Sequence, residues 1–130
     1  MLYKIVLYII FILVLSIGFG SLVSSQTAKE SPIPIEVFFA SVSAYTASPD
    51  ETDLDHGTTA SGKKAEGNII ACPSRYEFGT IVEIKGNEYI CEDRMNKRYR
   101  SGNYFDILME TKKEAFKWGR RTVEVTVIHI

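Results

Sequence analysis

Two aspartates in the second half of the chain have the side chains best suited to acid–base chemistry. Asp93 is followed by Arg94, and Asp106 comes 13 positions later, between Phe105 and Ile107. A carboxylate set among aromatic and aliphatic neighbours is costly to keep ionised, so such a group is usually either paired or used in a reaction. We interpret Asp106 as a residue that transfers protons.

Both aspartates could instead be structural. Asp106 could pair with Arg94 or Arg120, and Asp93 could form an ion pair with Arg94 beside it. Without an active-site role, these ion pairs would be the better explanation for acidic side chains in such a setting.

Strand patterns predominate around these residues, in the ranges 36–45, 80–85, 88–91, 104–108 and 122–127. Gly86 and Asn87 have the composition of a tight hairpin turn. One helix is expected: Thr111 and Glu114 form a capping box, and Gly119 ends the helix. Many short strands with one helix favour an all-β, closed barrel. On a strand, Tyr104 would share the face of Asp106.

The N-terminus has a different character from the rest. Residues 5–22 are almost uninterruptedly apolar, so residues 1–25 are either a signal peptide or an N-terminal membrane anchor, formed as an apolar helix. In both cases the remainder is exported, and an uncleaved segment would hold it at the membrane. Residues 26–34 are a proline-containing linker, and residues 35–130 form one domain. A net charge of −1 argues against nucleic acid as a partner.

Cys72 and Cys91 are the only cysteines, and an exported domain this small benefits from a disulfide. A redox pair or metal ligands are the alternatives, but the spacing matches neither motif. We expect no metal and no organic cofactor. The acidic range 50–57 lacks the ligand pattern of a calcium loop and is expected to be a solvated loop.

The range 58–64 carries small hydroxyl residues and a glycine, which let donors approach a polar ligand such as a sugar. Thr59 and Ser61 are therefore candidate binding residues. Tyr45 and Tyr104 are further candidates because aromatic rings stack on sugars, although the barrel core is the ordinary place for Tyr45.

Seven short motifs occur in an order that resembles the 3D domain, a family named for three aspartates. They are Tyr45-Thr46-Ala47, Thr59-Ala60-Ser61-Gly62, Ile70-Ala71-Cys72-Pro73, Phe78-Gly79-Thr80, Glu92-Asp93-Arg94, Phe105-Asp106-Ile107 and Ala115…Trp118-Gly119-Arg120. The resemblance covers about residues 45–127. It implies a small six-stranded double-psi β-barrel, similar to the catalytic barrel of membrane-bound lytic transglycosylase A and akin to rare lipoprotein A and the expansins.

The resemblance also implies residue roles. Asp106 matches the catalytic acid and base, and Asp93 matches a second aspartate of the groove. Cys72 stands where the third aspartate is expected, and the usual glycine-rich loop is replaced by residues 95–102. The chain is most similar to the small exported members of this family, and that resemblance implies that Cys72 and Cys91 pair with each other.

The implied function is cleavage of peptidoglycan glycan strands in cell-wall turnover, by a lytic transglycosylase or by a hydrolase of O-glycosyl bonds. The hydrolase would need Asp93 or Glu92 as a base for water. The alternative is a non-catalytic module that binds cell-wall polysaccharide, as in the expansins. A redox protein using the two cysteines is a weaker third possibility. We expect a monomer.

Overall fold

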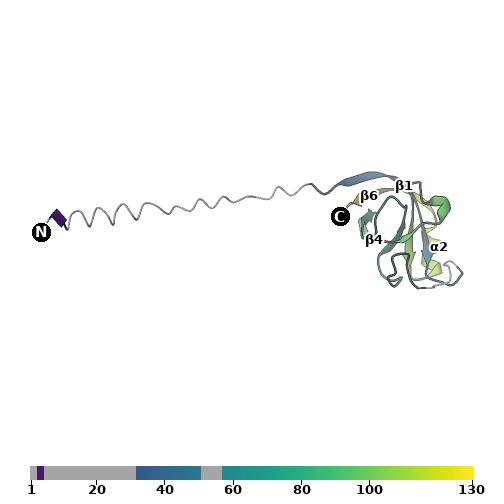
Figure 1. Ribbon diagram of the computed structural model, residues 1–130. Helices are drawn as coiled ribbons and strands as arrows, with labels where there is room; N and C mark the ends of the chain where they lie inside the picture. The colour runs from purple at the N-terminus through teal and green to yellow at the C-terminus, as the bar shows by residue number, and fades with distance from the viewer. Residues whose placement is uncertain (1–2, 5–31, 51–56) are drawn as a thin grey trace. The chain divides into compact units, whose positions relative to one another are not determined.

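The computed structural model describes residues 3–4, 32–50 and 57–130. Residues Pro32–Ile130 form one compact unit. Its elements are β1 (Ile35–Thr46), β2 (Ile69–Cys72), β3 (Ile81–Ile84), β4 (Asn87–Arg94), the short 3-10 helix η1 (Lys97–Tyr99), β5 (Tyr104–Met109), α2 (Lys112–Trp118) and β6 (Arg121–Ile128). The strands close into a barrel in the order β1-β5-β2-β4-β3-β6 (Figure 1). The expected all-β barrel with one short α-helix is confirmed for this unit.

The expected N-terminal apolar helix, most of the linker and the acidic range 51–56 lie outside the described residues. Within the described residues, no helix is both long and apolar enough to cross a bilayer.

Alternation of side chains explains the two longest strands. On β6, Val125 and Val127 are fully buried, whereas Thr126 between them is half-buried and Glu124 before them is exposed. On β1, Ala40 and Val42 are buried in the same way. A strand projects successive side chains to opposite faces, so apolar residues at every second position line the barrel interior. The predicted strands at 36–45 and 122–127 are confirmed.

The hairpin between β3 and β4 is confirmed, but its turn was predicted one residue too late. Ile84 pairs with Asn87, which leaves Lys85 and Gly86 as the two turn residues. Both have positive φ, 52° for Lys85 and 77° for Gly86. A tight hairpin with matching twist needs positive φ at both central positions, and glycine in the second of them satisfies this without steric cost. Asn87 instead begins β4.

Helix α2 begins and ends as predicted. The Thr111 hydroxyl accepts from the backbone N–H of Glu114, and the Glu114 carboxylate accepts from the backbone N–H of Thr111. This capping box satisfies N–H groups that lack partners inside the helix. Gly119 follows at φ 66°. The indole N–H of Trp118 donates to the carbonyl of Val42 at 3.2 Å, which attaches the helix to β1.

The barrel interior is filled from all six strands and from loop residues such as Tyr76. Phe105, Ile107, Val42 and Tyr76 are among the side chains with 1% exposure or less. Tyr76 comes from the segment after β2, and its ring lies 5.9 Å from that of Phe105. Tyr76 therefore fills a part of the core that no strand residue fills, and the strand pattern alone does not reveal it.

The predicted disulfide is present. Cys72 on β2 and Cys91 on β4 are bonded, are completely buried and have Cα atoms 5.8 Å apart. The two strands pair in parallel, and the chain between them passes through β3, which forms a hairpin with β4. The disulfide therefore closes a loop that contains β3.

The strand pairing contains an internal equivalence. Strands β1 and β5 pair in parallel, and so do β4 and β2, while every other pair is antiparallel. Exchanging β1 with β4, β2 with β5 and β3 with β6 leaves this scheme unchanged. The barrel thus consists of two interlocked three-strand halves, β1–β3 and β4–β6, with β2 and β5 adjacent at their junction.

We predict that replacing both cysteines by alanine lowers the free energy of unfolding by about 3 kcal/mol, because the unfolded chain regains the freedom of a loop spanning 19 positions. Urea unfolding in the absence of reductant measures this change. A reducing agent should lower the stability of the parent protein and leave that of the double variant unchanged. Equal stability of the oxidised parent and the double variant would contradict the prediction.

Candidate functional site

The two aspartates lie in one row across four adjacent strands. Ser43 of β1 pairs with Asp106 of β5, Asp106 pairs with Ala71 of β2, and Ala71 pairs with Asp93 of β4. Partners in register project their side chains to the same face of a sheet. Asp93 and Asp106, which are 13 positions apart in the sequence, therefore lie on one face, with only Ala71 between them in the row.

This face is the outside of the barrel. Phe105 and Ile107, which flank Asp106 on β5, are fully buried, whereas Asp106 itself is half-buried. Tyr104 and Leu108 share its face, as predicted for a strand. Ser43 donates a hydrogen bond from its hydroxyl to Oδ1 of Asp106. Asp106 is thus anchored by the neighbouring strand and remains at the surface.

Asp93 has a different environment, because three donors meet its two oxygens. The Tyr45 hydroxyl donates to Oδ2 at 2.7 Å, and the backbone N–H groups of Ala60 and Arg94 donate to Oδ1 at 3.0 and 2.8 Å. One of these donors is its own neighbour, one is on β1 and one is on the loop before β2. Asp93 therefore ties three segments together.

A bulge in β4 places a second acidic side chain beside Asp93. Ile70 pairs with Cys91 but Ala71 pairs with Asp93, so Glu92 is the extra residue on β4. A bulge re-aims the side chains on its strand. Here Glu92 and Asp93 both contact the segment Thr58–Lys64, which we call the hydroxyl loop.

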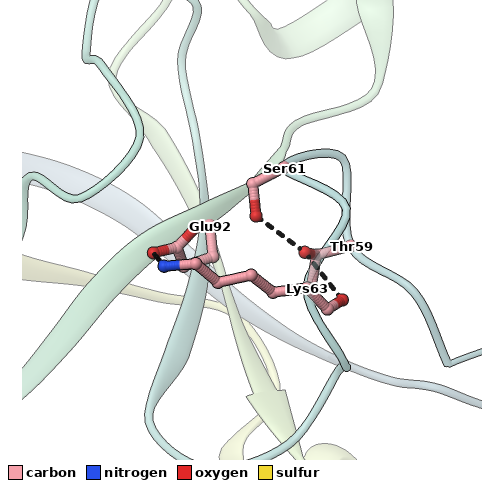
Figure 2. Close-up of polar contacts among 4 residues, drawn as sticks. All are labelled: Thr59, Ser61, Lys63 and Glu92. Carbon is pink, nitrogen blue, oxygen red and sulfur yellow. Dashed lines mark hydrogen bonds and ion pairs between the residues drawn. The ribbon is translucent and has the colours of Figure 1, made fainter.

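The hydroxyl loop is held to β4 by both of these residues, and Figure 2 shows the contact of Glu92 with Lys63. The Lys63 ammonium lies 2.5 Å from Oε1 of Glu92, and the Ser61 N–H donates to the Glu92 carbonyl at 3.1 Å. The Thr59 and Ser61 hydroxyls are 3.0 Å apart, and Thr59 also donates to the Lys63 carbonyl at 3.1 Å. These two hydroxyls, predicted to bind a ligand, contact each other, and the Ser61 side chain also bonds to the Glu92 carboxylate. A binding role for them stays a prediction.

The protonation of Glu92 follows from these contacts. Burial raises its pKa, but hydrogen bonds from Lys63 and Ser61 and the charge of Lys63 outweigh burial, so the pKa is lower than usual. Glu92 is 4% exposed. A buried, ion-paired carboxylate is poorly placed to activate water, which argues against Glu92 as the base of a hydrolytic reaction.

Tyr45 is half-buried between the two aspartates rather than in the core. Burial, the charge and hydrogen bond of Asp93 and the charge of Asp106 all raise the pKa of Tyr45 strongly. The phenol therefore stays neutral and acts as a donor. Tyr104 is more open, with 36% of its surface exposed, and its ring lies 5.0 Å from that of Tyr99. Of the two tyrosines, Tyr104 is therefore the more accessible one.

The arginines proposed as ion-pair partners have other contacts. The guanidinium of Arg94 lies 3.9 Å from the centre of the Phe78 ring and donates to Sγ of Cys91 at 3.5 Å. That of Arg120 lies 5.8 Å from the centre of the Tyr99 ring. Within the described part of the chain, neither arginine takes part in the ion pairs found.

A cavity of about 430 Å³ lies one step further along the same strands. Leu108, which shares the face of Asp106, forms part of its wall, together with Thr46 of β1 and Gly67 before β2. Glu66, Glu110 and Lys112 add charged groups to its lining. The outer surface is thus hollowed next to Leu108, toward the ends of β1 and β5.

Two residues of the site were missed in the sequence. Ser43 and Lys63 had no assigned role, although Ser41, Ser43 and Tyr45 form a period-two polar series that indicates an outward strand face. At position 72, where the resemblance leads one to expect an aspartate, the side chain points into the core as half of the disulfide. No carboxylate can reach the outer row from there.

We predict that Lys63→Met destabilises the domain by about 1 kcal/mol at pH 7, because buried Glu92 loses its partner. Lys64→Met is the matched control, since its pair with Glu66 is exposed at both ends and contributes little. Because the pKa of Glu92 is lowered by folding, its contribution is complete above its unfolded pKa and is lost as the pH falls through the folded value. Urea unfolding at pH 7 and pH 3 should therefore show the Lys63 effect shrinking in acid. An equal effect of both substitutions would contradict this assignment.

Comparisons with known proteins add no family to this description. No protein-family model matches the chain, and no curated protein matches its sequence.

Proposed function

We propose that this domain is an exported, peptidoglycan-cleaving double-psi barrel in which Asp106 is the catalytic acid and base. The observation that carries the proposal is the outer row Ser43–Asp106–Ala71–Asp93. It brings the two aspartates of the 3D-like motifs onto one face, with Asp106 at the surface. Two interlocked three-strand halves are also the arrangement that the term double-psi describes.

The contacts of the acidic residues favour a reaction with one working carboxylate. Asp93 is held by three donors and Glu92 by Lys63, so both are better suited to positioning than to proton transfer. Asp106 is fixed by Ser43 on a half-buried surface. Hydrolysis by two carboxylates needs a second residue as a base or a nucleophile, whereas internal attack by a hydroxyl of the substrate does not.

The proposed reaction is therefore the lytic transglycosylase type. Protonated Asp106 gives its proton to the glycosidic oxygen as that bond breaks, so the leaving sugar departs as an alcohol. The carboxylate then takes the proton of the muramyl 6-hydroxyl, whose oxygen bonds to the anomeric carbon. The product is a 1,6-anhydro sugar, and Asp106 ends protonated as it began. Ser43 holds the carboxylate in place, and the Tyr104 face provides a surface for a sugar ring.

We predict that the purified protein releases 1,6-anhydro-muropeptides from peptidoglycan, detected by mass spectrometry. Asp106→Asn should lower the rate about a hundredfold or more, because the amide cannot transfer the proton. Glu88→Gln is the matched control, since Glu88 is exposed on β4 away from the row and its loss should leave the rate unchanged. Circular dichroism checks that each variant is folded. Full activity of folded Asp106→Asn would overturn the mechanism.

Ser43→Ala should lower kcat about tenfold with little change in KM, because the serine orients Asp106 and does not bind the substrate. Ser43→Thr keeps the hydroxyl and should restore most of the rate. If the protein instead sediments with peptidoglycan and releases no fragment, and Asp106→Asn binds equally well, the polysaccharide-binding function replaces the enzymatic one.

A further inference from the structure

The first half of β1 has an open edge. Strand β6 pairs with β1 from Ile35 to Val42, but β5 pairs with it only from Ser41 onward. Residues 35–40 therefore have a neighbour on one side alone among the described strands. In Figure 1 this part of β1 is the blue strand that enters the barrel, with β6 running beside it. An edge of this length exposes backbone N–H and C=O groups that can pair with another strand.

The direction of the backbone groups follows from two hydrogen bonds. The Ser41 N–H donates toward the β5 side, to the Asn103 carbonyl at 2.9 Å, and the Pro34 carbonyl accepts on the β6 side from His129 at 3.1 Å. Backbone groups of successive residues alternate between the two edges of a strand. Ile35, Val37 and Phe39 thus direct their N–H and C=O groups to the open edge.

The same three residues have the most exposed apolar side chains of β1. Ile35 is 61% exposed, Val37 58% and Phe39 66%. They lie on the outer face, because alternate residues such as Phe38 and Ala40 point inward. No charged side chain interrupts the stripe, although lysine or proline commonly protects such an edge. Backbone groups and side chains therefore both favour an added strand with apolar residues at every second position.

The residues on the other face of this segment already have partners in the same barrel. The Phe38 ring packs 6.3 Å from that of Phe105, and the Arg75 guanidinium lies 5.8 Å from the centre of the Phe38 ring. Glu36 accepts from Tyr76 and is paired with His129. The one charge on the segment thus has its partners within the barrel, so it would not oppose a strand at the edge.

We propose that this edge pairs antiparallel with the same edge of a second copy, so that a continuous sheet joins two barrels. The segment is self-complementary about Val37. A two-fold axis there puts Val37 opposite Val37 and Ile35 opposite Phe39 on one face, and Glu36 opposite Phe38 on the other. No like charges meet, and about six backbone hydrogen bonds close the interface. The proposed dimer differs from the monomer expected from the sequence, and it does not depend on the proposed activity.

The outer face of β1 would then have two uses. Its odd-numbered residues are apolar from Ile35 to Phe39 and polar from Ser41 to Tyr45, and the change falls where β5 begins to pair. The apolar half meets the second copy, and the polar half belongs to the outer row that contains Asp106. The interface leaves β5 and its pairing with β2 untouched.

The test uses the full-length protein in detergent and measures mass by light scattering over a range of concentrations. We expect a dimer, and we expect Val37→Lys to raise the dissociation constant about tenfold or more, because two like charges face each other at the axis. Thr122→Lys is the matched control: Thr122 is exposed on β6, where it pairs with Ser41 and so lies outside the open edge of residues 35–40. It should leave the dimer unchanged.

A second measurement covers the case in which Val37→Lys fails to fold. Val37→Cys should form a disulfide-linked dimer on mild oxidation, because the position opposes itself across the axis, and Thr122→Cys should not. A parent protein that stays monomeric, or a dimer that neither responds to Val37→Lys nor crosslinks through Val37→Cys, overturns the proposal. In the second case association through the N-terminal apolar segment would account for the dimer.

Discussion

The arrangement of the site depends on one irregularity, the bulge that inserts Glu92 into β4. Without it, Glu92 rather than Asp93 would pair with Ala71, and Asp93 would point into the barrel, because a shift of one residue reverses the faces of a strand. With the bulge, two consecutive acidic residues contact the hydroxyl loop. The Glu92 carboxylate pairs with the Lys63 ammonium, and the Asp93 carboxylate accepts from the Ala60 N–H. The bulge therefore sets both the position of the loop and the side of the barrel on which Asp93 lies.

The disulfide acts at the same place from the other face. Cys91 is the last residue before the bulge, and its bond to Cys72 fixes β4 against β2 inside the barrel. On the outer face, Asp93 bonds β4 to Tyr45 and to the hydroxyl loop. The register across these two strands is thus held on both faces. A fixed register matters here, because Asp106 and Asp93 share a row only through Ala71 between them.

Much of the local structure could be predicted from the sequence. The alternation in β1 and β6, the capping box of α2 and the disulfide all depend on residue types close to one another or on a unique pair. Strand β2 was harder: its four residues are all buried, so no alternation marks it. The turn at Lys85 and Gly86 was misplaced because composition indicates a turn but not which two residues carry positive φ.

The site was predictable as a list of residues and not as an arrangement. Asp93 and Asp106 were found from their types, but the role of Ser43 depends on a parallel pairing between strands 63 positions apart. Local periodicity carries no information on such a register. The same holds for Tyr76, a core residue supplied by a loop, and for Lys63, whose partner Glu92 lies 29 positions away.

The interlocking of the two halves has a consequence for how the chain acquires its structure. Among the described strands, the only pairing between consecutive strands is the β3–β4 hairpin; β1 must wait for β5 and β6. Contacts between distant segments form slowly, because the intervening chain must first be brought together. An emerging polypeptide would therefore hold only the pairings among β2, β3 and β4 until β5 was made, with β1 still lacking a partner, and the barrel could close only after the last strand had joined β1 to β3.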